Sequence, residues 1–176
     1  MAVPEQLHAN LEIKARCADL DAARLRAARL ATEHVGADHQ VDTYFVTTRG
    51  RLKLRESSLS GGQLVPYLRP DQVGPKRSDY RVIPVEDPAS LKALLSEILG
   101  VHRVVDKQRE IFLFENVRIH LDRVKQLGSF LELEAVFDGS PAAEVEQQRK
   151  VDWLMQELRV APGDLLATSY ETLLSG

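Results

Sequence analysis

The sequence predicts an α+β fold in which about eight strands close into an antiparallel β-barrel flanked by helices. The first observation is that strand-like segments separated by turn signals fill most of the 176 residues, while helical patterns occur in three or four places. The second observation is that charged residues recur on one face of nearly every predicted strand. Because an open sheet rarely needs charges on one face of so many strands, we expect the sheet to close with these faces inward.

Residues 10–16, with the sequence NLEIKAR, give the clearest alternation. As a strand, this segment places Glu12, Lys14 and Arg16 on one face and apolar residues on the other, because side chains alternate with period two. Other segments with such a face contain Arg51, Lys53 and Arg55; Lys107 and Arg109; Arg118, His120 and Asp122; and Glu132 and Glu134. A barrel with these faces inside would enclose a basic channel with a cluster of carboxylates.

Turn and capping signals divide the chain into elements. We expect strands over residues 10–16, 40–46, 51–56, 63–69, 81–85, 101–114, 116–121 and 129–137. We expect helices over residues 19–35, 88–99, 141–159 and 164–174, the first of them ended by Gly36. Residues 70–80 read as a loop, and the alternative is a crossing between strands that brings Lys76 and Arg77 to the channel. Since no linker or repeat interrupts the chain, we expect a single domain over residues 1–176.

Composition narrows the class of protein. The formal net charge of −3 argues against a general nucleic-acid binder, so any basic site must be local. The single cysteine, Cys17, cannot form an internal disulfide, which fits a reducing compartment. The N-terminal residues contain no apolar signal core, and no apolar run reaches membrane-spanning length. We therefore expect a cytoplasmic protein without a membrane partner.

The charged faces indicate a polyanion and a divalent cation. A triphosphate carries roughly four negative charges, and proteins hold such groups with several Arg and Lys side chains. Glu12, Glu132 and Glu134 would repel it unless Mg²⁺ or Mn²⁺ lay between them, since these hard cations take carboxylate oxygens and bridge to phosphate. Among the five histidines only His120 shares the face of the charged residues. A lipocalin-like barrel for apolar ligands would require the opposite alternation.

The motifs resemble one family along nearly the whole chain. NLEIK resembles the ExExK signature of CYTH proteins, the triphosphate tunnel metalloenzymes, which include class IV adenylyl cyclases, thiamine triphosphatases and inorganic tripolyphosphatases. Further agreement lies in QVDTYF, RLKLRE, YLRPD, GPKRSDY, VDKQREIF, IHLDRVKQLGSFLELE and SYETLL. The resemblance is greater to the cyclase-like branch. It implies an eight-stranded antiparallel tunnel, open at both ends, with a triphosphate along its floor.

The resemblance also implies roles for residues. The metal ligands would be Glu12, Glu132 and Glu134. Lys14 would lie near the triphosphate and help activate the nucleophile, and Asp122 would position the nucleophile or a metal. The phosphates would be held by Lys53, Arg55, Arg69, Lys76, Lys107 and Arg109.

Two positions depart from the family pattern. Asn10 replaces the first glutamate of the signature, and an amide carries no charge and cannot act as a base. This change weakens metal affinity or one metal site. Gln126 occupies a turn position where many relatives have glycine.

Three functions are consistent with the sequence. We favour hydrolysis of tripolyphosphate or an organic triphosphate with Mg²⁺ or Mn²⁺ as cofactor. The alternative is a class IV adenylyl cyclase that converts ATP to cyclic AMP and pyrophosphate. The third is a tunnel that binds polyphosphate or nucleotide with weak or no catalysis, because Asn10 replaces the signature glutamate. The expected partner is a triphosphate-containing small molecule and not a nucleic acid, and a homodimer is left open.

Overall fold

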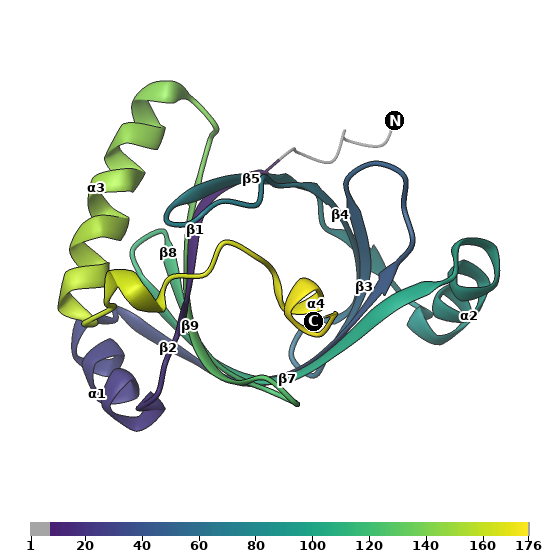
Figure 1. Ribbon diagram of the computed structural model, residues 1–176, viewed down its shortest axis with the longest axis horizontal. Helices are drawn as coiled ribbons and strands as arrows, with labels where there is room; N and C mark the ends of the chain where they lie inside the picture. Colours follow the sequence, from purple (N-terminus) through teal and green to yellow (C-terminus); the bar gives the residue numbers. More distant parts are fainter. Residues whose placement is uncertain (1–7, 176) are drawn as a thin grey trace.

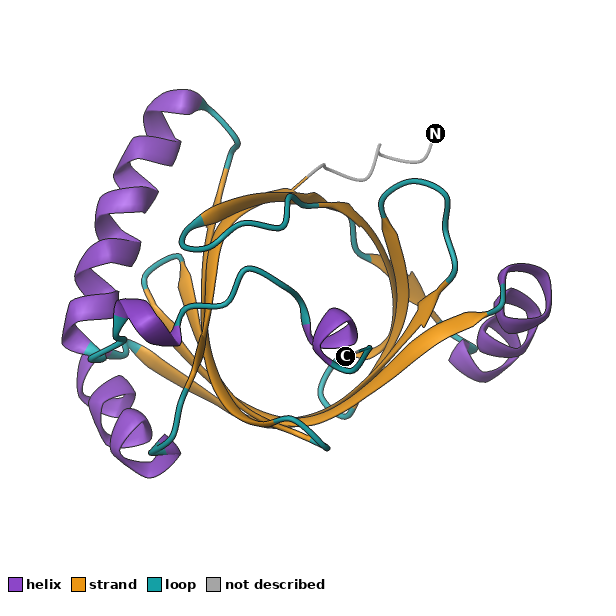
Figure 2. Cartoon of the chain, viewed as in Figure 1, coloured by secondary structure: helices purple, strands orange, loops and turns teal. Residues whose placement is uncertain are grey.

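Eight antiparallel strands close into a barrel in the computed structural model, which describes residues 8–175. The ring consists of β1 (His8–Arg16), β2 (Glu33–Phe45), β3 (Arg51–Ser57), β4 (Gly61–Leu68), β5 (Lys76–Tyr80), β7 (Val101–Phe114), β8 (Val117–Val124) and β9 (Gly128–Phe137). Their order is β3-β2-β7-β8-β9-β1-β5-β4, and pairing of β3 with β4 closes the ring (Figures 1 and 2). The short strand β6 (Ile83–Val85) pairs with β4 alone. The predicted fold class is confirmed.

The apolar faces of the strands point outward and pack beneath helices. Leu11, Ile13 and Leu133 are buried in a core shared with α1 (Leu20–Leu30) and α3 (Pro141–Glu157). Both helices lie on the same side of the ring, whereas α2 (Pro88–Leu99) lies on the opposite side (Figure 1). Because alternation sends the other residues of each strand inward, the charged faces line the interior as predicted.

The C-terminal segment covers one mouth of the barrel. After α3 the chain forms a short 3₁₀ turn, η1 (Pro162–Asp164), and crosses the ring to α4 (Tyr170–Leu173) (Figure 1). The Leu166 amide donates to the Lys14 carbonyl at 2.9 Å, which fixes the segment to β1. Tyr170 then packs in a second apolar cluster with Tyr44, Val105 and other residues from inside the barrel.

The predicted first helix is too long. It ends at Leu30, and residues 33–40 belong to β2, where they pair with β7. Gly36 is not a helix end but lies at a register shift of this ladder with a φ of 119°, a conformation that suits glycine. The segment is polar, so its strand character depends on pairing with a distant strand and not on local pattern.

Three further boundaries differ from expectation. The segment predicted as a loop contains β5, whose residues 76–80 pair with β1, so a strand does lie here, but neither Lys76 nor Arg77 lines the cavity, as the crossing alternative had proposed. The predicted strand over residues 81–85 is limited to 83–85, and the terminal helix expected over residues 164–174 is limited to α4, because residues 165–169 are not helical. Residues 1–7, which contributed to the absence of a signal core, lie outside the described part of the chain.

The turn between β8 and β9 holds Gln126 in a backbone conformation that glycine adopts more easily. Gln126 adopts a φ of 70°, in the left-handed region that glycine occupies without steric cost. A glycine would therefore be less strained than Gln126 in this turn. Among residues 8–175, none of the helices has the length and apolar character that crossing a membrane requires.

Candidate functional site

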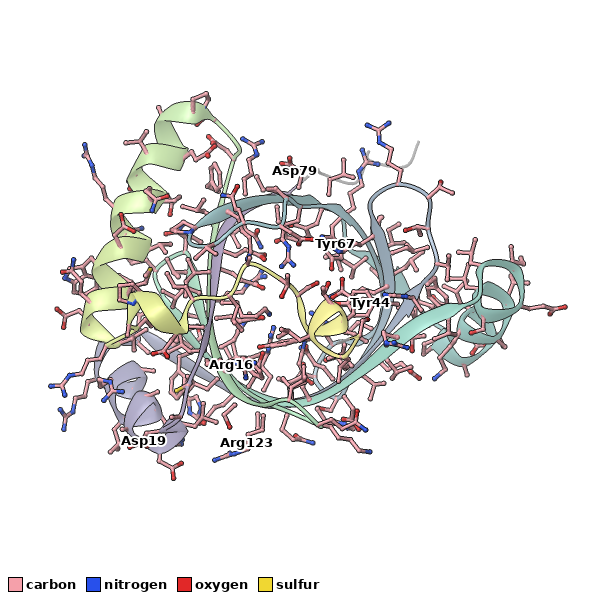
Figure 3. The ribbon with its side chains drawn as sticks, viewed as in Figure 1. Arg16, Asp19, Tyr44, Tyr67, Asp79 and Arg123 are labelled. Atoms are coloured by element: carbon pink, nitrogen blue, oxygen red, sulfur yellow. The ribbon has the colours of Figure 1, made fainter. Side chains whose placement is uncertain are left out.

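The barrel interior is a cavity of about 560 Å³ whose walls carry most of the predicted site residues. The members that line it are Glu12, Lys14, Lys53, Arg55, Arg69, Lys107, Arg109, Glu132 and Glu134. Lys76 and Asp122 do not line it, although both are buried. Among the labelled side chains, Tyr44 and Tyr67 lie inside the ring beside α4, while Asp79 and Arg123 lie outside it (Figure 3).

Three cations surround one buried carboxylate, that of Asp42. Arg55 binds it with two hydrogen bonds of 2.7 and 2.8 Å, and Lys53 donates to it at 3.0 Å. Lys107 completes the group at 3.3 Å. Burial would raise the pKa of Asp42, but these cations outweigh that effect and hold the pKa well below its usual range. The cluster therefore has an excess of positive charge, which an anion can neutralise.

A second group of ion pairs lies under α4. Arg109 donates to both oxygens of Asp122 at 2.7 and 2.6 Å and also reaches Glu132 at 2.5 Å. The Tyr170 hydroxyl donates to Asp122 at 2.7 Å, so the C-terminal segment contacts the same network. Lys14 forms an ion pair with Glu132, and its ammonium lies 3.4 Å from the centroid of the Tyr170 ring. Asp122 is thus an anchor for Arg109 and α4.

Burial shifts the lysines in the cavity toward their neutral form. Burial and the neighbouring Arg109 lower the pKa of Lys107 to about 7. Burial likewise lowers the pKa of Lys14 well below its usual value, and it lowers that of Lys53. A bound polyanion would favour the charged form of these amines.

Three side chains on β8 and β9 could hold a metal ion. Ligand atoms of His120, Glu132 and Glu134 lie within 4.8 Å of one another. His120 Nδ1 is buried, has no hydrogen-bond partner among residues 8–175, and lies 3.6 Å from Glu132 and 3.8 Å from Glu134. Burial and Arg109 lower the pKa of His120 to about 3, so the imidazole is neutral and its nitrogen is able to coordinate a cation.

Glu12 and Lys76 contact protein groups that do not belong to the two clusters or to the group of possible metal ligands. The Glu12 carboxylate accepts from Arg69 at 2.5 Å, and Glu12 is not in the group of three metal-ligating candidates. Lys76 donates to the carbonyls of Leu166 and Ala167 at 3.1 Å each, which ties β5 to the C-terminal segment. A metal role for Glu12 and a phosphate role for Lys76 stay predictions.

Asn10 lies inside the cavity, as its place in the signature predicts. It is 5% exposed, and its Oδ1 has no hydrogen-bond partner within the described chain. The position therefore lacks the negative charge of a glutamate next to the other charged groups of β1.

Sequence reasoning missed several participants. Asp42 and Tyr44 share the inward face of β2 and lie within the strand expected over residues 40–46, but a lone aspartate there gave no signal. His120 was noticed only for its alternation. Tyr170 was assigned to a terminal helix with no link to the channel, because no local pattern shows that this helix covers a barrel mouth.

The chain belongs to the CYTH domain family, whose model matches residues 8–170. The PH1012 protein of Pyrococcus horikoshii has the same fold, with 23% identity, a TM-score of 0.77, and coverage of 93% of this chain and 98% of that one. A "putative adenylate cyclase" of Vibrio parahaemolyticus aligns at 20% identity with a TM-score of 0.75 over 98% and 99% of the two chains.

A more distant structure is a "putative adenylyl cyclase" from Hippeastrum, described as having a dominant triphosphatase activity. It aligns at 14% identity with a TM-score of 0.58 over 96% of this chain and 95% of that one. At such identities these likenesses show the fold. A search of curated proteins gave no match to the chain.

Proposed function

We propose that this chain is a divalent-metal-dependent enzyme that hydrolyses a triphosphate bound inside the barrel. The observation that carries the proposal is the group of three cations, Lys53, Arg55 and Lys107, around the buried Asp42. One carboxylate cannot balance three cations, and a row of phosphate oxygens supplies the missing negative charge. Arg109 lies in the same cavity and extends the cationic surface toward Glu132.

The chemistry of the donors fits a divalent cation. Glu132 and Glu134 offer carboxylate oxygens, and His120 offers a buried nitrogen without a hydrogen-bond partner. The nitrogen favours Mn²⁺ over Mg²⁺, because Mg²⁺ prefers oxygen ligands only. A cation held there would neutralise phosphate oxygens and orient a water molecule for attack on the terminal phosphorus.

The protein's own groups would do the remaining work. Lys53, Arg55, Lys107 and Arg109 bind the phosphate oxygens and fix the direction of the chain of phosphates. Lys14 lies beside the carboxylates, and burial lowers its pKa, so its neutral amine would accept a proton from the attacking water. Asp122 holds Arg109 in position, so it acts through that residue.

Relatives support a triphosphate as the ligand. The Hippeastrum protein is described as having a dominant triphosphatase activity, which favours hydrolysis. The name given to the Vibrio parahaemolyticus protein favours ATP cyclisation, and this is our second candidate. In cyclisation the same cations would hold the phosphates while a ribose hydroxyl attacked the first phosphorus.

A product-resolved assay tests the proposal. The chain is incubated with Mn²⁺ or Mg²⁺ and, separately, with tripolyphosphate, ATP and thiamine triphosphate. Orthophosphate release from any of them supports the hydrolase, and cyclic AMP with pyrophosphate from ATP supports the cyclase. If no product forms but the triphosphate raises the melting temperature, the chain is a binding tunnel.

Replacing Asn10 tests whether the residue at this position limits the rate of turnover. Asn10→Glu restores the signature carboxylate inside the cavity. A large gain in rate would identify a catalyst weakened at this position, and an unchanged rate would show that the position is dispensable. Gln108→Glu, at an exposed position of β7, is the control for adding a charge elsewhere.

A further inference from the structure

The cavity continues beyond the cations to a wall of a different kind. Along β7, Val105 packs under α4, Lys107 and Arg109 follow, and Ile111 and Leu113 line the cavity beyond them. Val35 and Leu59 line the same end and are 42% and 53% exposed, so the cavity reaches solvent there. We call this end, lined by Val35, Gln40, Leu59, Ile111 and Leu113, the open half. Phosphate binding makes no use of its apolar side chains.

Gln40 presents an unsatisfied acceptor in this half. The side chain lines the cavity, is 5% exposed, and donates from Nε2 to the Asp38 carboxylate at 2.7 Å. A carboxylate only accepts hydrogen bonds, so this contact fixes the amide with Nε2 toward Asp38 and Oε1 away from it. Oε1 is buried and has no hydrogen-bond partner among residues 8–175.

Asp38 is held firmly enough to keep Gln40 in this orientation. Its carboxylate also accepts from the Ser57 and Ser58 hydroxyls at 2.8–2.9 Å and from the Leu59 amide at 3.1 Å. A buried acceptor without a donor has lost its hydrogen bonds to water and gained none in return, so a fixed Gln40 Oε1 favours any ligand that brings an N–H group.

We propose that the open half binds the organic part of an organic triphosphate, a largely apolar group that donates an N–H to Gln40 Oε1. The inference rests on the proposed function, because the phosphates must lie against the cations. Gln40 is directly opposite Lys107 in the β2–β7 ladder, so the acceptor adjoins the phosphate site. Ile111 is four residues past Lys107, about 13 Å along the strand, a span that an organic group attached to the phosphates can reach.

Inorganic tripolyphosphate would gain nothing from these groups. All its outer atoms are acceptors or carry negative charge, so it cannot satisfy Gln40 Oε1 and would leave the apolar wall in water. A cavity of about 560 Å³ is also within the range of roughly 300–1,000 Å³ typical of sites for drug-sized molecules. The chain is therefore selective for organic triphosphates over tripolyphosphate.

Calorimetry tests the selectivity. The full chain is titrated in EDTA, so that turnover is suppressed, with tripolyphosphate, ATP, GTP, CTP and thiamine triphosphate. We expect one or more of the organic compounds to bind about tenfold or more tightly than tripolyphosphate, as one satisfied acceptor and a covered apolar wall predict. Tripolyphosphate binding as tightly as the best organic compound would overturn this inference while leaving the proposed function intact. Binding of none of them, with Mn²⁺ also tested, would overturn both.

Two variants separate recognition from folding. Gln40→Met keeps the length of the side chain without the acceptor, and Leu113→Asn makes the apolar wall polar. Each should weaken the best organic triphosphate about fivefold to tenfold and leave tripolyphosphate within twofold. Ile98→Asn, on the outer helix α2 where Ile98 is 66% exposed, is the control and should change neither. Equal losses for both ligands would mean that these residues only support the fold, and would overturn the inference.

Discussion

The two ends of the tunnel differ in how their polar groups are satisfied. In the half under α4, which we call the capped half, the protein pairs its own charges: Asp42 contacts three cations and Glu132 contacts Lys14 and Arg109. In the open half, Gln40 has an acceptor without a partner beside apolar walls. We therefore expect the capped half to bind the phosphates and the open half to bind the organic group attached to them.

The ion pairs in the capped half also stabilise the folded chain. Buried cations without counterions would cost several kcal/mol each, and Asp42, Asp122 and Glu132 offset that cost. A polyanion would compete with these carboxylates for the same cations. Its binding should therefore rearrange existing ion pairs and stabilise the folded chain.

Removing cations from the capped half should have the largest effect. The double variant Lys53→Ala with Arg55→Ala deletes two charged donors, each worth about 1.5–3 kcal/mol, so affinity for tripolyphosphate should fall on the order of 1,000-fold. Calorimetry measures it, with circular dichroism to confirm folding. Arg29→Ala, on the exposed surface of α1, is the control. Affinity within threefold of wild type would show that the charged faces do not bind the phosphates.

Removing the carboxylate that these cations share should have the second-largest effect, and it should act on stability. Asp42→Asn leaves Lys53, Arg55 and Lys107 without their carboxylate, so the free energy of unfolding should fall by about 3 kcal/mol. Urea denaturation measures this change. Added tripolyphosphate should stabilise the variant more than the wild type, because the anion replaces the lost charge. Asp106→Asn, on the same ladder but partly exposed, should change stability by less than about 0.5 kcal/mol.

The pH should change affinity moderately. In the protein without a bound anion, the pKa of Lys107 is about 7, so its amine loses a proton as the pH rises through that value. A bound polyanion favours the charged ammonium form. Affinity should therefore fall between about pH 7 and about pH 9, and binding should take up protons, measurable by calorimetry in buffers of different ionisation enthalpy. Lys107→Arg keeps its charge at every pH tested and should remove the part of the pH dependence that comes from Lys107. Any pH dependence that remains would come from titration of the ligand.

The lowered pKa of Lys107 also affects the stability of the protein without a bound anion, and here a rise in pH is favourable. The unfolded chain binds more protons at Lys107 than the folded chain does above about pH 7, so this residue makes stability rise with pH up to its unfolded pKa. A stability profile of Lys107→Arg parallel to that of the wild type across this interval would contradict the assignment.

The contact between α4 and the capped half should have the smallest effect. Tyr170→Phe deletes the hydrogen bond to Asp122, while Arg109 still pairs with that carboxylate. We expect a loss of about 1–2 kcal/mol in the free energy of unfolding and faster hydrogen exchange in the C-terminal segment. Exchange that is unchanged there would show that this bond does not hold α4 over the mouth.

The sequence revealed the capped half better than the open half. Alternation of charge predicts the inward side of Lys14, Lys53 and Lys107, since a strand has only two faces. It does not reveal that Gln40 and Asp38 are paired or that Gln40 Oε1 is left free, because those facts depend on the turn between β3 and β4.

The errors have the same origin. Residues 33–40 and 76–80 are polar or follow proline and glycine, and only pairing with β7 and β1 makes them strands. The bonds of Lys76 to backbone carbonyls of the C-terminal segment were not predicted either. Contacts between segments far apart in the chain leave no local pattern.

A crystal structure of the chain with tripolyphosphate and Mn²⁺ tests the central claim most directly. We predict phosphate oxygens within hydrogen-bond distance of Lys53, Arg55 and Lys107, and anomalous scattering from Mn²⁺ beside Glu132 and Glu134. An anion bound outside the barrel, with Asp42 still holding all three cations, would contradict the account.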